Sequence, residues 1–76
     1  MDRTKTGALI AAARKEQNMT QKELAAALHV SDRAVSKWER GAGFPDISLL
    51  EPLADALGLG VLYLLRGEQG LSLIHI

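Results

Sequence analysis

The sequence predicts an all-α fold, a compact bundle of five short helices, and three observations support this prediction. Apolar residues recur at helical spacing, as in Leu50, Leu53, Ala54 and Leu57, which follow the i, i+3, i+4, i+7 pattern. No alternating stretch of strand length and no Asn-Gly or Asp-Gly turn occurs before residue 71. With 76 residues, 47% of them apolar, the chain has room for one small core and one domain.

Each of the first three predicted helices carries a stripe of apolar residues on one face. The stripes are Leu9, Ile10 and Ala13 in the first helix, Leu24, Ala25 and Leu28 in the second, and Val35 and Trp38 in the third. The second helix is predicted to begin at Gln21, because Thr20 and Glu23 have the spacing of a capping box. In that arrangement each side chain accepts a hydrogen bond from the backbone amide of the other residue.

The third helix is predicted over Asp32–Arg40, with Ser31 as its N-cap and Gly41 as its glycine C-cap. The second and third helices are then separated only by His29, Val30 and the cap Ser31. Such a short connection is typical of a helix-turn-helix.

The fourth helix is predicted to begin at Asp46 or Ser48 and to end at Gly58. The later start is favoured because Pro52 then falls near the first turn, where its missing amide costs little. Ser48 and Glu51 also have the spacing of a capping box, which supports a start at Ser48.

A short fifth helix is predicted over Val61–Leu65, closed by Gly67. The uncharged tail Leu71–Ile76 has two interpretations: a C-terminal strand that pairs with its twin in a dimer, or a segment that is not native. We favour the second, because the codons CTG TCT CTT ATA CAC ATC would encode it and match a transposon end used to prepare sequencing libraries. The expected division is a domain over residues 1–70 and a tail over residues 71–76, with a C-terminal sensing or dimerisation domain missing if the tail is not native.

The exposed face of the third helix is polar and carries cations. It consists of Asp32, Arg33, Ser36, Lys37 and Arg40. A helix of this size fits the major groove of duplex DNA, where such donors and acceptors can reach base edges and phosphates.

From about Lys5 to Glu68 the chain resembles the phage repressor and Cro-like (XRE-type) helix-turn-helix domains of bacterial and phage transcription regulators. The residues that carry the resemblance are 19–25 (MTQKELA), 30–41 (VSDRAVSKWERG), Pro45 and 53–58 (LADALG). The resemblance implies the lambda-repressor-like fold and sequence-specific binding of double-stranded DNA, with the third helix in the major groove. Because members of this family have glycine in the turn where this chain has His29, we expect His29 to adopt a left-handed conformation at a small strain cost.

The resemblance also implies roles for individual residues. Gln21 falls at a position that hydrogen-bonds a phosphate, and Ser31 at the phosphate-contacting entry to the third helix. Base reading is implied for Asp32, Arg33, Ser36 and Lys37, and contact with the DNA backbone for Arg40. Arg14 and Glu39 match a pair that the family buries as an ion pair between the first and third helices.

Composition excludes several other functions. The chain has no cysteine, its two histidines are isolated in sequence, and no nucleophile has a base and an orienting group, so we expect neither an enzyme nor a metal or cofactor site. The longest apolar runs fall far short of the roughly 20 residues that span a bilayer, so no membrane association is expected. We therefore expect a cytoplasmic protein.

The net charge of zero argues against a nucleic-acid binder until its distribution is considered. Residues 1–40 carry eight Lys or Arg and five Asp or Glu, a net charge of +3, whereas residues 41–76 carry one and four, a net charge of −3. The basic half contains the predicted helix-turn-helix, so neutrality limits nonspecific affinity without excluding DNA. The expected partners are double-stranded DNA and a second copy in a homodimer; the alternative is a protein-interaction module, an antitoxin or a coactivator-like adaptor.

Overall fold

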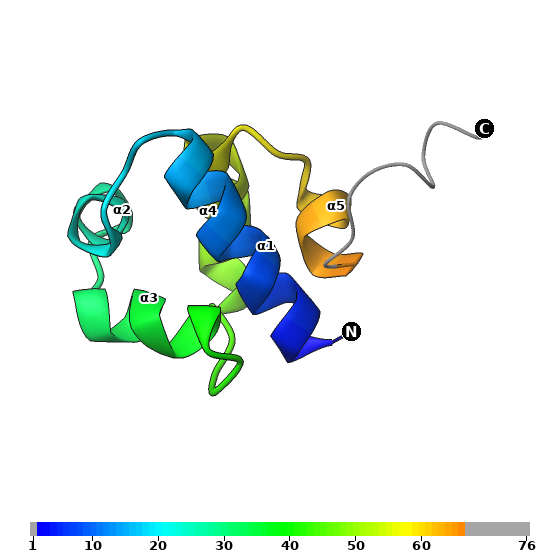
Figure 1. The fold of residues 1–76 in the computed structure, drawn as a ribbon. Helices are drawn as coiled ribbons and strands as arrows, with labels where there is room; N and C mark the ends of the chain where they lie inside the picture. Colours follow the sequence, from blue (N-terminus) through cyan, green and yellow to red (C-terminus); the bar gives the residue numbers. More distant parts are fainter. Residues whose placement is uncertain (1, 67–76) are drawn as a thin grey trace.

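Five α-helices surround one core in the computed structural model, which describes residues 2–66 (Figure 1). They are α1 (Arg3–Glu16), α2 (Gln21–Leu28), α3 (Asp32–Glu39), α4 (Leu50–Leu57) and α5 (Val61–Arg66), and the 3-10 turn η1 (Ile47–Leu49) precedes α4. The predicted all-α fold is confirmed, and no strand occurs in the described range. Gly67 and the tail over residues 71–76, for which a strand was one interpretation, lie outside that range.

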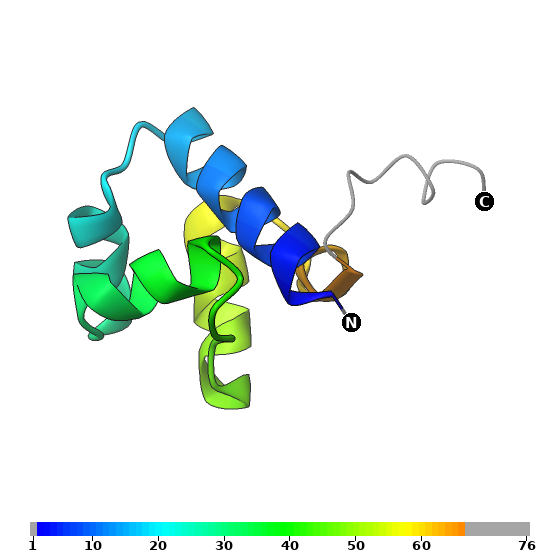
Figure 2. The same ribbon diagram turned by 60° about the horizontal axis from the view of Figure 1, so that its bottom comes forward.

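The core joins all five helices at one place. α1 crosses the bundle and packs against α3 and α5, while α2 packs against α3 and α4 (Figures 1 and 2). Each α-helix contributes one aliphatic side chain with no exposed surface: Ile10, Leu24, Val35, Leu53 and Leu64. Because burying such a side chain stabilises the fold by about 1.5–3 kcal/mol, these contacts fix the position of α3 relative to the other helices.

The start of α2 is confirmed at Gln21. The Glu23 amide donates to Thr20 Oγ1 at 3.0 Å, and the Thr20 amide donates to Glu23 Oε1 at 2.8 Å, so both halves of the predicted capping box are present. The helix ends at Leu28, and His29 follows it in the left-handed conformation, with φ 59° and ψ 40°. The left-handed turn expected at His29 is therefore confirmed.

We predict that His29→Gly stabilises the domain by about 0.5–1 kcal/mol, because glycine adopts this conformation without the steric cost that a side chain incurs. The side chain of His29 is exposed, so its removal leaves no cavity. Urea denaturation followed by circular dichroism would measure the change. A destabilised variant would show that the histidine side chain contributes contacts that outweigh the strain.

The predicted caps of α3 also hold, with one difference at its end. Ser31 Oγ accepts a hydrogen bond from the Ala34 amide at 3.2 Å. The helix ends at Glu39, one residue before the predicted Arg40, which takes the C-cap position, and Gly41 then turns the chain at φ 74°.

The predicted start of α4 was wrong. Asp46 caps the short turn η1, because its carboxylate accepts hydrogen bonds from both the amide and the hydroxyl of Ser48. These hydrogen bonds hold the pKa of Asp46 below its usual value. Ser48 is thereby engaged with Asp46 and caps nothing, so the Ser48–Glu51 capping box does not form and α4 begins at Leu50 without a side-chain cap.

Candidate nucleic-acid interface

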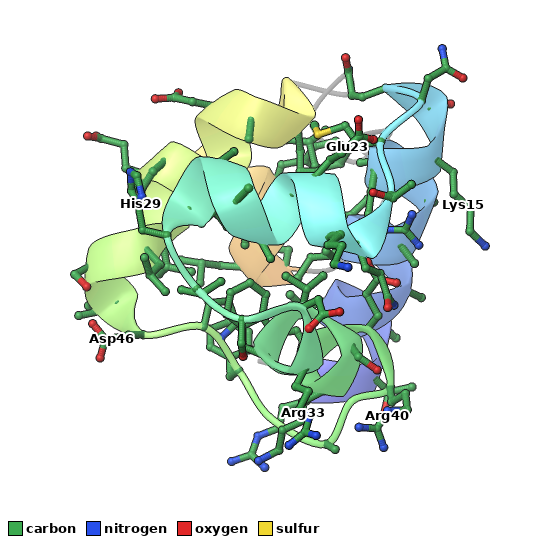
Figure 3. The ribbon with its side chains drawn as sticks, turned by 90° about the vertical axis from the view of Figure 1, so that its left-hand side faces the viewer. Lys15, Glu23, His29, Arg33, Arg40 and Asp46 are labelled. Atoms are coloured by element: carbon green, nitrogen blue, oxygen red, sulfur yellow. The ribbon has the colours of Figure 1, made fainter. Side chains whose placement is uncertain are left out.

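The polar face predicted on α3 points away from the core. Val35 and Trp38 are buried, whereas the side chains of Asp32, Arg33, Lys37 and Arg40 are exposed and that of Ser36 is half-buried. Figure 3 shows Arg33 and Arg40 projecting from α3 on the same side of the molecule, away from the bundle. The structure thus brings the predicted base-contacting residues together on one open face.

Three of the predicted contact residues, Ser31, Ser36 and Arg40, take part in local hydrogen bonds of α3. Arg40 Nε donates to Ser36 Oγ at 3.4 Å, which links the exit of α3 to its exposed face. Ser31 uses its hydroxyl oxygen to cap α3, so the hydroxyl hydrogen can still be donated to an acceptor such as a phosphate.

Arg14 and Glu39 form the ion pair that the family resemblance implied. Arg14 Nε donates to Glu39 Oε2 at 2.7 Å and Arg14 Nη2 donates to Glu39 Oε1 at 3.1 Å, so the contact is bidentate. Arg14 Nη1 also donates to the carbonyl oxygen of Met19 at 2.7 Å, just before α2. The pair is nearly buried. Its hydrogen bonds connect α1, the entry to α2 and the end of α3.

The environment of Glu39 favours its ionised form. Burial acts to raise the pKa of Glu39, but the hydrogen bonds from Arg14 and Gln21 and the charges of Arg14 and Lys15 lower it by more, so the pKa lies below its usual value. The hydrogen bond to Glu39 raises the pKa of Arg14 against the opposing effect of burial. Both groups are charged at neutral pH.

Gln21 has a partner that sequence reasoning missed. Its side-chain Nε2 donates to Glu39 Oε1 at 3.0 Å, across 18 residues of chain. The sequence predicted only a phosphate contact for Gln21, from its position at the start of α2. No local sequence signal links this glutamine to Glu39. The two residues meet only because α2 packs against α3.

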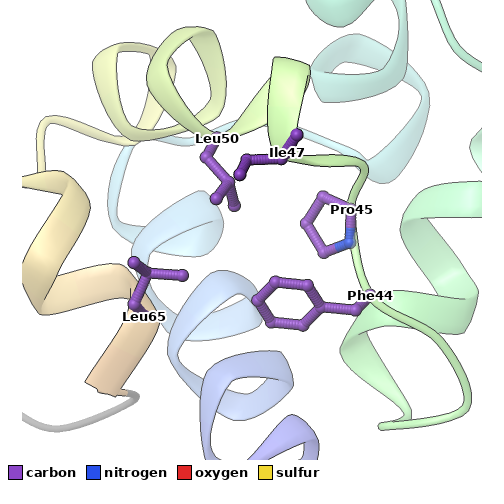
Figure 4. A pocket seen from close by; sticks show the side chains of 5 residues that line it. All are labelled: Phe44, Pro45, Ile47, Leu50 and Leu65. Atoms are coloured by element: carbon purple, nitrogen blue, oxygen red, sulfur yellow. The ribbon is translucent and has the colours of Figure 1, made fainter. Parts of the chain in front are cut away.

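The described residues also form an apolar groove whose lining residues do not lie on α3. A groove of about 350 Å³ lies between the loop after α3, the start of α4 and the end of α5 (Figure 4). Its lining residues are Phe44, Pro45, Ile47, Leu50 and Leu65, all apolar, so it offers no group that could hold a phosphate or carry out acid–base chemistry.

Within residues 2–66, no cluster of histidine and acidic side chains could hold a metal ion. In the same range, no helix is long and apolar enough to cross a membrane. The exposed side chains of Arg33, Lys37 and Arg40 make the cationic face of α3 the candidate site of the described domain.

A tight turn joins two helices, the second of which presents an open polar face, and this arrangement defines a helix-turn-helix domain. A family model described as helix-turn-helix matches residues 10–64, more than half of the chain. The chain belongs to the XRE-type helix-turn-helix family.

Several known proteins are similar to this chain. The HTH-type transcriptional activator BcrR of Enterococcus faecalis is 38% identical over 60 residues, which are 79% of this chain and 29% of BcrR. The clp gene regulator ClgR of Corynebacterium glutamicum superposes with a TM-score of 0.78 at 33% identity, covering 88% of this chain and 71% of ClgR. The P22 c2 repressor, solved in complex with a synthetic operator, superposes with a TM-score of 0.79 at 36% identity, covering 83% of this chain and 96% of the repressor chain.

The coverage of these relatives differs. The chain spans less than a third of the length of BcrR but nearly all of the P22 c2 repressor chain in its operator complex. The shared unit is therefore the helix-turn-helix domain itself.

Proposed function

We propose that this domain binds double-stranded DNA in a sequence-specific manner as part of a bacterial or phage transcription regulator. The observation that carries the proposal is the open face of α3, on which Arg33, Lys37 and Arg40 are exposed beside Asp32. The similarity to the P22 c2 repressor, whose structure contains an operator, supports the same function for this chain. In this proposal the domain binds DNA without catalysing a reaction, and the regulator acts in the cytoplasm.

In the proposed complex α3 lies in the major groove and its side chains have separate tasks. Arg33 and Lys37 donate to the acceptors on guanine edges, while Asp32 accepts from the cytosine amino group. Gln21, Ser31 and Arg40 contact phosphates on either side of the groove and fix the position of α3 along the duplex. The amino terminus of α2 adds a favourable dipole for the phosphate beside Gln21.

We further propose that two copies bind as a homodimer to half-sites about 34 Å apart, one helical turn of DNA. One α3 of eight residues contacts only a few base pairs, and two copies double both the contacts and the discrimination. Sedimentation of the protein with and without its duplex would measure the stoichiometry.

Salt dependence provides the test of DNA binding. We expect the affinity for duplex DNA to fall by roughly 10³ between 50 and 200 mM salt if a dimer makes six or more phosphate contacts. Lys37→Ala is expected to weaken binding by at least about fivefold, the effect of one lost base contact. Fluorescence anisotropy of a labelled duplex measures both quantities.

Arg66→Ala is the matched control, since it removes one exposed cation from the end of α5, away from α3 (Figure 1). We expect its affinity to stay within about twofold of the unmodified chain, because α5 does not pack against α3 and salt screens exposed charges increasingly with distance. Equal effects of the two substitutions would contradict binding through α3. Undetectable or salt-independent binding would instead favour the protein-interaction module.

A further inference from the structure

The hydrogen bond between Gln21 and Glu39 determines which end of the glutamine amide is available to DNA. A glutamine side chain carries a carbonyl oxygen that only accepts and an amino group that only donates, and the two ends exchange places when the group rotates by about 180°. A phosphate only accepts. Gln21 can therefore serve a phosphate contact in one of its two orientations but not in the other.

Glu39 selects the productive orientation. Its carboxylate is ionised at neutral pH and can only accept, so the nitrogen of Gln21 must face it, at the 3.0 Å found between Nε2 and Oε1. The rotated amide would place its oxygen against the carboxylate, and two acceptors would then face each other in a nearly buried position. The amino group has a second hydrogen, for which the described residues provide no acceptor.

The bidentate contact with Arg14 makes this arrangement compatible with DNA. A carboxylate near the duplex would by itself repel the phosphates, but Arg14 holds both oxygens of Glu39 and compensates its charge. The same two hydrogen bonds fix the position of the carboxylate, so the orientation imposed on Gln21 is fixed as well.

We infer that Glu39 is a positioning residue for DNA binding, which holds the amide of Gln21 with its free N–H directed outward to donate to a phosphate. The inference rests on the proposed function, because it deepens the phosphate contact proposed for Gln21. It assigns Glu39 a second task besides the ion pair with Arg14.

A double-mutant cycle on DNA affinity tests the inference. Gln21→Met keeps the length of the side chain and removes its donors, and we expect it to weaken binding to a labelled duplex by about tenfold in the unmodified chain, as expected for one hydrogen bond to a charged group. In a Glu39→Gln background the same substitution is expected to cost about fivefold, because an amide that residue 39 no longer orients spends only about half of its time with the amino group directed outward.

Glu51→Gln is the charge-matched control background, since Glu51 is exposed in the first turn of α4. There the effect of Gln21→Met should remain about tenfold. A role of Glu39 in stability alone would lower the unfolding free energy of Glu39→Gln while leaving the effect of Gln21→Met unchanged, and that result would overturn the inference. If Gln21→Met does not weaken DNA binding in any background, the inference is also overturned. If the unmodified chain does not bind DNA at all, the proposed function is overturned instead.

A measurement on the unmodified protein avoids any dependence on the folding of Glu39→Gln. With ¹⁵N-labelled glutamine, NMR resolves the two side-chain amide protons of Gln21. On addition of duplex DNA we expect one proton to keep its chemical shift, because it stays bonded to Glu39, and the other to move downfield. Displacement of the proton bonded to Glu39, or no change in either proton, would contradict the inference.

Discussion

Arg14→Ala is expected to destabilise the domain by about 3–5 kcal/mol at pH 7, because it leaves Glu39 charged, nearly buried and without its cation. The carbonyl oxygen of Met19 loses its hydrogen bond from Arg14 in the same variant. A domain of this size has a total stability of roughly 4–11 kcal/mol, so the substitution should remove about a quarter or more of it. Urea denaturation followed by circular dichroism measures the loss.

The pH dependence gives the same prediction a second readout. In the unmodified protein the lowered pKa of Glu39 means that its stabilising contribution is present above the unfolded value of about 4.3 and is lost as the pH falls through the folded pKa. Without Arg14, Glu39 loses the hydrogen bonds and the charge that lower its pKa most, while burial still raises that pKa. Protonation of Glu39 then removes the unpaired buried charge. The difference in stability between the two proteins should therefore narrow as the pH falls from the folded pKa of Glu39 in Arg14→Ala to its lower folded pKa in the unmodified protein.

Lys15→Ala is the control, because Lys15 is exposed and makes no hydrogen bond with Glu39. Its loss should change stability by less than about 0.5 kcal/mol. A destabilisation of Arg14→Ala no larger than that of Lys15→Ala would contradict the structural role given to the ion pair.

Gly7→Ala is the second substitution with a large expected effect. A Cβ atom at this position in α1 would lie far inside van der Waals contact of the Trp38 carbonyl oxygen and 3.0 Å from that of Glu39. Both obstacles are backbone atoms at the end of α3, so the two helices must move apart. We expect a loss of about 2–3 kcal/mol, although alanine is by itself the better helix former by about 1 kcal/mol.

Gly60→Ala is the matched control, since a Cβ atom there would meet nothing within 4 Å. Thermal unfolding should place it within about 0.5 kcal/mol of the unmodified chain. Because Gly7 also sets how closely α3 approaches α1, the folded fraction of Gly7→Ala should bind duplex DNA more weakly. Unchanged stability of Gly7→Ala would show that the α1–α3 distance is adjustable.

The helix boundaries that the sequence predicted correctly depend on hydrogen bonds between near neighbours. Thr20, Glu23, Ser31 and Gly58 act within a few residues of their own positions, so their spacing contains the necessary information. At the start of α4 two such signals compete: Asp46 as a cap, and the capping-box spacing of Ser48 and Glu51. Asp46 binds Ser48 and the chain enters a 3-10 turn, an outcome that the two spacings alone did not distinguish.

The contacts that sequence reasoning missed are formed between residues far apart in the chain. Gly7 appeared to be an ordinary glycine in a helix, and only the crossing of α1 and α3 shows why a side chain cannot fit there. Thr6 is buried and donates its hydroxyl to the Leu64 carbonyl at 3.2 Å, and Gln21 donates to Glu39. No spacing of residues in the sequence indicates either contact. The exposed face of α3 was predictable because it follows directly from helical periodicity.

Selection of duplexes from a randomised library tests most directly whether α3 reads DNA sequence. We expect the unmodified chain to enrich a two-fold symmetric motif with half-sites separated by about 10 base pairs. Arg33→Gln should change the preferred base at one position of each half-site, whereas Gln21→Met should lower affinity without changing the motif. No enriched motif, or the same motif from the Arg33→Gln variant as from the unmodified chain, would contradict sequence reading by α3.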